Sequence, residues 1–222
     1  LAYGEWFGMD PLYVEGIRDI SLTDLRFADE LGYRIKLLGI IKQNGDGDVE
    51  IRVHPTLISK KALLADVSEV FNAVMVNGDY VGSTMFYGRG AGREATASAV
   101  VADIIDIARD MAAGCRSGIR AFRPGKLFRN LLPMEKTENR YYLRIQVKDI
   151  PGVIARMSAI LGNKGISISS FIQKEGQSED NVSLMILTHL TREELIKSAI
   201  AEMEKLEEVC EKVKLFRIED IS

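Results

Sequence analysis

The stretch Lys148-Asp149-Ile150-Pro151-Gly152-Val153 separates two hydrophobic patterns. Before it, apolar residues alternate with polar ones, which is typical of a strand with one buried face. After it, apolar residues recur three and four positions apart, which is typical of a helix. Pro-Gly favours a tight turn between two such elements. The two patterns are carried by Leu143, Ile145 and Val147, and by Val153, Met157, Ile160 and Leu161.

The same kind of pattern continues to the end of the chain. Glycines at residues 162–165 end the helix, a second strand begins at Ile166, and residues 181–190 form a third. Thr191-Arg192-Glu193-Glu194 is a capping box that opens a second helix, and residues 213–218 alternate as a fourth strand. The order strand-helix-strand-strand-helix-strand is ferredoxin-like. We assign this fold to residues 140–222.

Residues 1–113 combine helices and strands in a different order. A capping box at Ser21–Asp24 opens a helix that ends at Gly32. Two hairpins follow, with turns at residues 44–47 and 77–79, and a longer helix covers residues 96–113. Because tight turns join most of these strands, the sequence predicts an α+β fold with a mixed, mostly antiparallel sheet and helices, followed by the ferredoxin-like domain.

Residues 114–139 resemble neither neighbour. Four arginines, two prolines and scattered aromatic residues occur there without a clear period. We therefore interpret this segment as a connector between a first domain, residues 1–113, and a second domain, residues 140–222.

The composition excludes several classes of protein. A net charge of −3, with Lys and Arg scattered, gives no support to nucleic-acid binding. No apolar run reaches the roughly 18 residues that a membrane span needs. Cys115 and Cys210 lie far apart, which favours free thiols in a reducing cytosol over a disulfide. With only two histidines, no metal site is predicted. We expect a cytoplasmic protein that binds neither nucleic acid nor membrane.

A glycine-rich loop, Gly88-Arg89-Gly90-Ala91-Gly92, lies between a strand pattern and a helix pattern. Glycines at such a turn let backbone N–H groups approach a phosphate. The spacing, however, is G-x-G-x-G rather than G-x-G-x-x-G, and no second strand ending in an acidic residue follows. The loop is therefore not a complete dinucleotide site. A tight structural turn, and a loop that touches a cofactor held by another domain, remain equally good interpretations.

The turn at Asp149-Ile150-Pro151-Gly152 precedes a helix N-terminus, whose free N–H groups suit a small carboxylate. Asp149 can meet an ammonium group, and Ser167, early in the next strand, can supply a hydroxyl. An amino-acid effector needs this combination of groups. On the residues alone, a plain Pro-Gly turn with a solvated Asp is the stronger interpretation.

Five segments of the first domain together resemble the later part of homoserine dehydrogenase, over residues 1–113, which corresponds to part of that family's substrate and dimerisation domain. The last 80 or so residues resemble an ACT domain, an amino-acid-sensing module often appended to that enzyme. The five segments are YVEGIRDIS (13–21), DLRFADELGYRIKLLGI (24–40), VHPTL (53–57), VFNAV (70–74) and GRGAGREATASAVVADIIDIAR (88–109).

The resemblance implies an oxidoreductase that reduces aspartate semialdehyde to homoserine with NAD(P)H, in the biosynthesis of threonine, methionine and isoleucine. The family's catalytic lysine and substrate carboxylates precede the position of Leu1, so no catalytic residue is assigned. We expect a fragment that is inactive and binds no cofactor tightly by itself. Gly88, Gly90, Ala91 and Gly92 correspond to the loop that approaches the nicotinamide cofactor. Ala95 departs from the family, which often has Pro there.

In the ACT part, the resemblance places effector contacts at Asp149, Gly152, Val153 and Ser167. It implies threonine as the effector and a homodimer or higher homo-oligomer, in which the edges of two ferredoxin-like sheets pair. Ser167 stands where relatives often have Asn, which leaves the identity of the ligand open. The alternative function is a non-catalytic module for amino-acid sensing and dimerisation.

Overall fold

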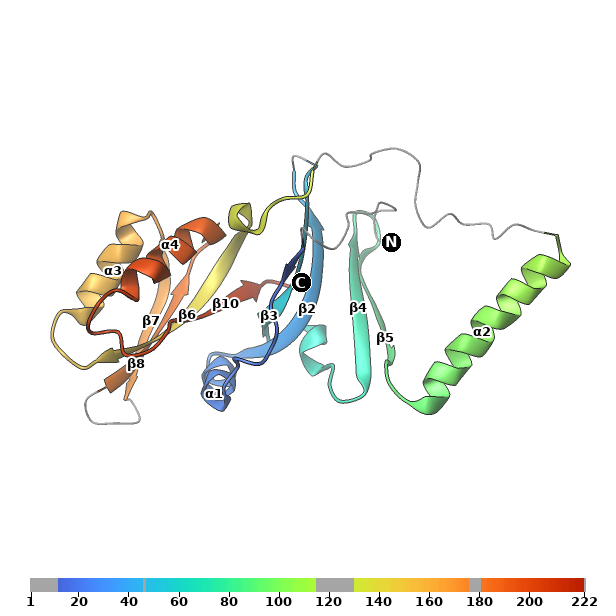
Figure 1. Ribbon diagram of the computed structural model, residues 1–222, viewed down its shortest axis with the longest axis horizontal. Helices are drawn as coiled ribbons and strands as arrows, with labels where there is room; N and C mark the ends of the chain where they lie inside the picture. The colour runs from blue at the N-terminus through green and yellow to red at the C-terminus, as the bar shows by residue number, and fades with distance from the viewer. Residues whose placement is uncertain (1–11, 46, 115–129, 176–180, 222) are drawn as a thin grey trace. The chain divides into compact units, whose positions relative to one another are not determined.

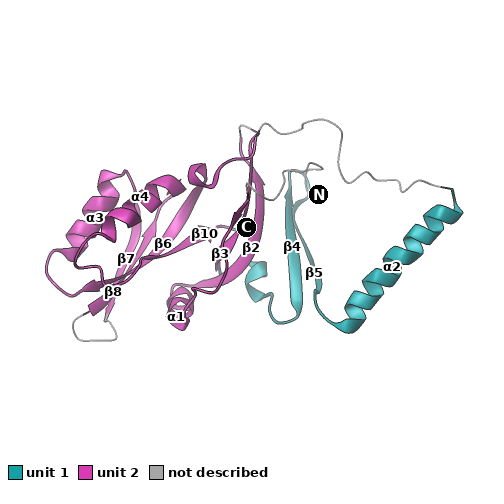
Figure 2. Ribbon diagram, viewed as in Figure 1, with its two compact units in different colours: residues 1–6, 59–127, 221–222 teal, residues 7–58, 128–220 magenta. Residues whose placement is uncertain are grey.

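The computed structural model describes residues 12–45, 47–114, 130–175 and 181–221. The chain divides into two compact units (Figure 2). Residues 7–58 and 128–220 form the larger unit, and residues 1–6, 59–127 and 221–222 form the smaller one.

The larger unit is built on one mixed sheet. Its strands are β1 (Tyr13–Val14), β2 (Tyr33–Gln43), β3 (Val49–Ser59), β6 (Glu138–Lys148), β7 (Ile168–Glu175), β8 (Asn181–Thr188), β9 (Thr191–Arg192) and β10 (Lys214–Glu219). Within the described residues the order is β1-β3-β10-β6-β8-β7, with β2 beside β3 and β9 beside β6 (Figure 1). The segment β10-β6-β8-β7 is antiparallel throughout, which is the ferredoxin-like arrangement. The predicted fold class is confirmed.

Helices α3 (Val153–Asn163) and α4 (Glu193–Met203) cover one face of this sheet (Figure 1). Alternate side chains of β6 and β8 point towards them, so the apolar stripes of the helices and strands form one core. The residues predicted to form the stripe of α3 are all buried. The capping box predicted at residues 191–194 was wrong, because Arg192 is the N-cap of α4 and makes no side-chain capping bond. The core includes Leu143, Ile145, Val153, Met157, Leu161, Leu184, Ile186, Ile196, Ala199 and Met203.

Helix α1 (Leu22–Glu30) packs on a second core, formed by side chains of the opposite face of the sheet. The predicted capping box at its start is present, because Ser21 accepts from the Asp24 backbone and the Asp24 carboxylate accepts from the Ser21 backbone. Arg144 on β6 donates from Nε to Oδ1 of Asp24 at 2.7 Å, which ties the helix to the sheet. This core contains Ala28, Leu57, Tyr142, Met185, Leu187, Phe216 and Ile218.

Strands β3 and β10 bring distant parts of the sequence together. They pair in parallel, with Thr56 beside Arg217 and Leu57 beside Ile218. One sheet therefore contains strands from both sides of the predicted connector. Residues 115–129 of that connector lie outside the described residues, and the division into domains stays a prediction.

The smaller unit contains the predicted second hairpin and long helix. It consists of the 3-10 turn η1 (Leu63–Asp66), β4 (Phe71–Gly78), β5 (Gly82–Arg89) and α2 (Arg93–Ala112). Gly78 pairs with Gly82, so the hairpin turn lies at residues 79–81, two positions later than predicted. No residue of α2 is buried among the described residues, and its apolar side chains are exposed.

Candidate functional site

A pocket opens where β6 ends and α3 begins. It has a volume of about 330 Å³ and includes the Asp149-Ile150-Pro151-Gly152-Val153 turn in its wall. Gly152 is the N-cap of α3 and has φ +90°, a conformation that favours glycine. We call this the loop pocket. The turn takes this shape because Pro-Gly stops β6 and leaves the first N–H groups of α3 without partners inside the helix.

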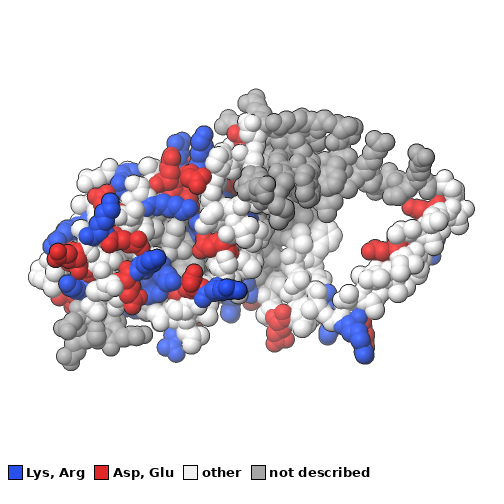
Figure 3. All heavy atoms as spheres, viewed as in Figure 1, with Lys and Arg blue, Asp and Glu red and all other residues white. Residues whose placement is uncertain are grey.

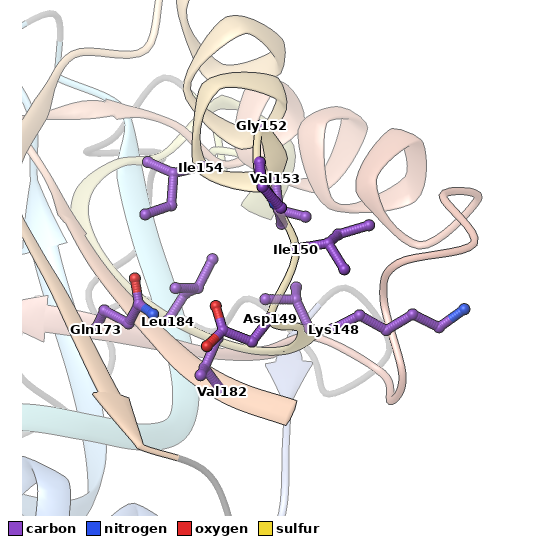
Figure 4. A pocket seen from close by; sticks show the side chains of 11 residues that line it. Lys148, Asp149, Ile150, Gly152, Val153, Ile154, Gln173, Val182 and Leu184 are labelled. Carbon is purple, nitrogen blue, oxygen red and sulfur yellow. The ribbon is translucent and has the colours of Figure 1, made fainter. Parts of the chain in front are cut away.

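The loop pocket has polar and apolar sides. Figure 4 shows the Asp149 carboxylate and the Gln173 amide near Val182 and Leu184, with Ile154 on the helix side. A carboxylate suits an ammonium group, free helix N–H groups suit a carboxylate, and the aliphatic side chains suit a short apolar side chain. The arrangement therefore matches a small α-amino acid.

The structure brings together three of the four residues predicted to bind an effector. Asp149, Gly152 and Val153 line the loop pocket, whereas Ser167 does not. Ser167 is exposed just before β7, where its carbonyl accepts from the His189 backbone at 2.9 Å. Gln173 lies six positions further along the chain, or about 20 Å along an extended strand. Gln173 was missed, because nothing in its local sequence indicates which residue of β7 reaches the turn.

The glycine loop of the smaller unit is held by β4. The Gly90 backbone donates to the Val70 carbonyl at 2.9 Å. A Cβ at Gly90 would come within 1.9 Å of the Asn72 side chain, so packing against Asn72 explains why a glycine stands here. Gly92 has φ +129° and caps α2, and a Cβ there or at Gly88 would meet nothing within 4 Å. Gly88 and Gly92 thus leave open space, and Ala91 between them is exposed.

A buried ion pair, which the sequence analysis did not predict, joins α4, β10 and β1. Arg217 donates to both carboxylate oxygens of Glu193, from Nε at 3.0 Å and from Nη2 at 2.5 Å. Tyr141 also donates to Glu193, and Arg217 donates to the Tyr13 hydroxyl. Burial would raise the pKa of Glu193, but its bonds with Arg217 hold that pKa below the usual range. The pair is therefore charged and fully desolvated.

A second buried group lies on β3. His54 is completely buried, and its Nδ1 lies 3.0 Å from the Thr56 hydroxyl oxygen. Its Nε2 has no partner among the described atoms. Burial, reinforced by the nearby charge of Arg217, lowers the pKa of His54 to about 4. The imidazole is therefore neutral at physiological pH.

The surface of the larger unit carries charges of both signs (Figure 3). Figure 3 shows basic and acidic side chains interspersed on the visible face of the larger unit. In the part of the chain that the structure describes, no cluster of His, Cys, Asp and Glu could hold a metal ion. None of the described helices is long and apolar enough to cross a membrane. Cys210 is an exposed free thiol, and Cys115 lies outside the described residues.

Comparison with known families accounts for both halves of the chain. Residues 1–105 match the homoserine dehydrogenase family model, and residues 141–208 match the ACT domain model. This chain belongs to the homoserine dehydrogenase family. The glycine loop lies in the homoserine dehydrogenase region, and the turn of the loop pocket lies in the ACT region.

Individual relatives of known sequence and structure support the same family assignment. The homoserine dehydrogenases of Pseudomonas aeruginosa and Neisseria gonorrhoeae are 47% and 46% identical, over all of this chain and over 52% and 51% of their own lengths. A homoserine dehydrogenase from Thiobacillus denitrificans has a TM-score of 0.84 and 45% identity, over 95% of this chain and 48% of that structure. The chain thus spans about half the length of the relatives it matches. These relatives are oxidoreductases.

Proposed function

We propose that the chain is a fragment of a homoserine dehydrogenase, with part of the substrate and dimerisation domain and the ACT regulatory domain. The whole enzyme would interconvert aspartate semialdehyde and homoserine with NAD(P), under control by threonine at the ACT domain. The supporting observation is the loop pocket, which places a carboxylate, free helix N–H groups and aliphatic side chains around about 330 Å³. Threonine carries the ammonium, carboxylate and short side chain that these groups complement. The enzyme would act in the cytoplasm, in amino-acid biosynthesis.

The glycine loop gives this chain a role beside the cofactor. Gly88 and Gly92 fit such a role, because the space beside them lets a ligand approach their backbone. At Gly90 the Asn72 side chain occupies the position that a Cβ would take, so the proposed approach is beside Gly88 and Gly92. The backbone of this loop would help to position NAD(P), which would supply or accept the hydride when bound.

A dimer explains the position of Ser167. β7 is the edge strand of the described sheet, with β8 on one side only, and such an edge can pair with a second copy. Antiparallel pairing of two β7 strands would carry Ser167 of the partner subunit towards Gln173. The effector site would then combine groups from two subunits.

Threonine binding tests the proposed effector. At about 100 times its dissociation constant, threonine should stabilise the chain by roughly 2.7 kcal/mol in a thermal-shift scan. Asp149→Asn removes the ammonium partner at an exposed position and should weaken binding at least tenfold. Asp79→Asn is the matched control, since Asp79 is exposed in the β4–β5 turn and does not line the loop pocket. The assignment would be contradicted if threonine did not stabilise the wild-type protein, or if Asp149→Asn bound threonine as tightly as the wild type.

The alternative function is a non-catalytic module for amino-acid sensing and dimerisation. It is favoured by the complete ferredoxin-like sheet and its pocket, beside a glycine loop that has no complete dinucleotide site in the described chain. Catalysis by the whole protein discriminates between the two. A full-length version that binds threonine but never oxidises homoserine would favour the module.

A further inference from the structure

A second pocket, of about 510 Å³, lies between α1 and the sheet. It is lined by Arg144 and Gln146 of β6 and by Ser183 of β8, whereas the loop pocket is lined by Val147, Val182 and Leu184 of the same strands. Because side chains alternate along a strand, the two pockets lie on opposite faces of the sheet. We call the second one the α1 pocket.

Arg144 is an incompletely used cation in this pocket. Its side chain is only 9% exposed, and its one hydrogen bond among the described residues runs from Nε to Asp24. A guanidinium has five N–H donors, and the two amino groups of Arg144 have no partner within the described residues. Burial would raise the pKa of Asp24, but Arg144 and Ser21 hold it below the usual range, so this carboxylate is charged. These N–H groups can donate to a second carboxylate, in the forked geometry that arginine favours.

Charged side chains of both signs surround Arg144 in this pocket. Arg26 and Lys214 line the same pocket and compensate an added negative charge. Glu211 and Asp19 also line it, and neither carboxylate has an ion-pair partner within the described residues. Phe27 adds an apolar wall. A ligand with a carboxylate and an ammonium group on a short frame satisfies both signs, which a simple anion does not.

We propose that the α1 pocket is a second amino-acid site, with the ligand carboxylate on Arg144 and its ammonium near Glu211. The pocket volume lies in the range usual for small-molecule sites. The ligand would touch α1, from the homoserine dehydrogenase region, and β6 and β8, from the ACT region. Occupancy would strengthen the contact between these two regions. This assignment does not depend on threonine binding in the loop pocket.

The α1 pocket can be tested in the background of Asp149→Asn, which should weaken binding at the loop pocket at least tenfold. Isothermal titration with each common amino acid, and with acetate and methylamine as single-charge probes, should find one site per chain for at least one amino acid. Acetate and methylamine should each bind at least tenfold more weakly. Equal binding by acetate would overturn the zwitterion assignment, and no binding by any amino acid would overturn the site.

Two further variants locate the binding. Gln146→Glu places a carboxylate beside Arg144 and keeps the oxygen that accepts from Ser183 at 2.7 Å, so the sheet should remain intact. It should weaken binding in the Asp149→Asn background at least tenfold, yet leave threonine binding unchanged in the wild-type background. Glu211→Gln, at an exposed position, should weaken binding about threefold or more. Binding that is unchanged in both variants would overturn the proposed site even if the loop pocket behaves as expected.

Discussion

At the scale of single residues, His54 makes stability depend on pH. Its folded pKa of about 4 lies below the ordinary value of 6.5, so between these values the unfolded chain binds the extra proton. Stability therefore rises with pH across this window and falls as the solution is acidified below about 6.5. The loss should reach roughly 3 kcal/mol near pH 4. Urea unfolding between pH 7 and pH 4.5 measures it.

The matched substitutions for this prediction are His54→Gln and His189→Gln. The first should remove most of the pH dependence between 4.5 and 6.5, because glutamine has no proton to gain. The second changes an exposed histidine and should leave the wild-type pH dependence in place. Identical pH profiles for wild type and His54→Gln would contradict the role assigned to the buried imidazole.

At the scale of elements, the ion pair between Glu193 and Arg217 joins α4 to β10, and Tyr13 extends the contact to β1. Glu193→Gln leaves Arg217 with only the partly exposed Glu15 carboxylate, 2.9 Å from its Nη1, as counter-charge. We expect a cost of about 3 kcal/mol, the low end of the range for a broken buried pair. The neighbouring Glu194 has a half-exposed side chain, and Glu194→Gln should change the free energy of unfolding by less than about 0.5 kcal/mol. Equal unfolding midpoints for the two variants would show that the buried pair contributes little.

The elements also show how far the sequence could predict the structure. The stripe of α3, the capping box of α1 and the β4–β5 hairpin depend on residues close in sequence, and all three are present. The pairing of Thr56 with Arg217 depends on two segments meeting from opposite sides of the connector, and no local period encodes it. For the same reason, the turn residues of the loop pocket were predictable, whereas Gln173 and the Glu193–Arg217 pair were not.

At the scale of the whole molecule, we predict that this chain alone does not oxidise homoserine. The chain spans about half of its homoserine dehydrogenase relatives, and its glycine loop offers backbone to a cofactor without a complete dinucleotide site. The exposed apolar side chains of α2 support the same prediction. Ile104 is 59% exposed, Ile107 61% and Met111 76%, which is typical of a helix that another part of a protein covers.

The assay for this prediction is homoserine-dependent formation of NAD(P)H, with the full-length Pseudomonas aeruginosa homoserine dehydrogenase as the positive control. Threonine binding by the same preparation would show that it is folded, so that absence of turnover reflects missing chemistry. Turnover above the background rate would instead mean that the residues of this chain suffice for hydride transfer.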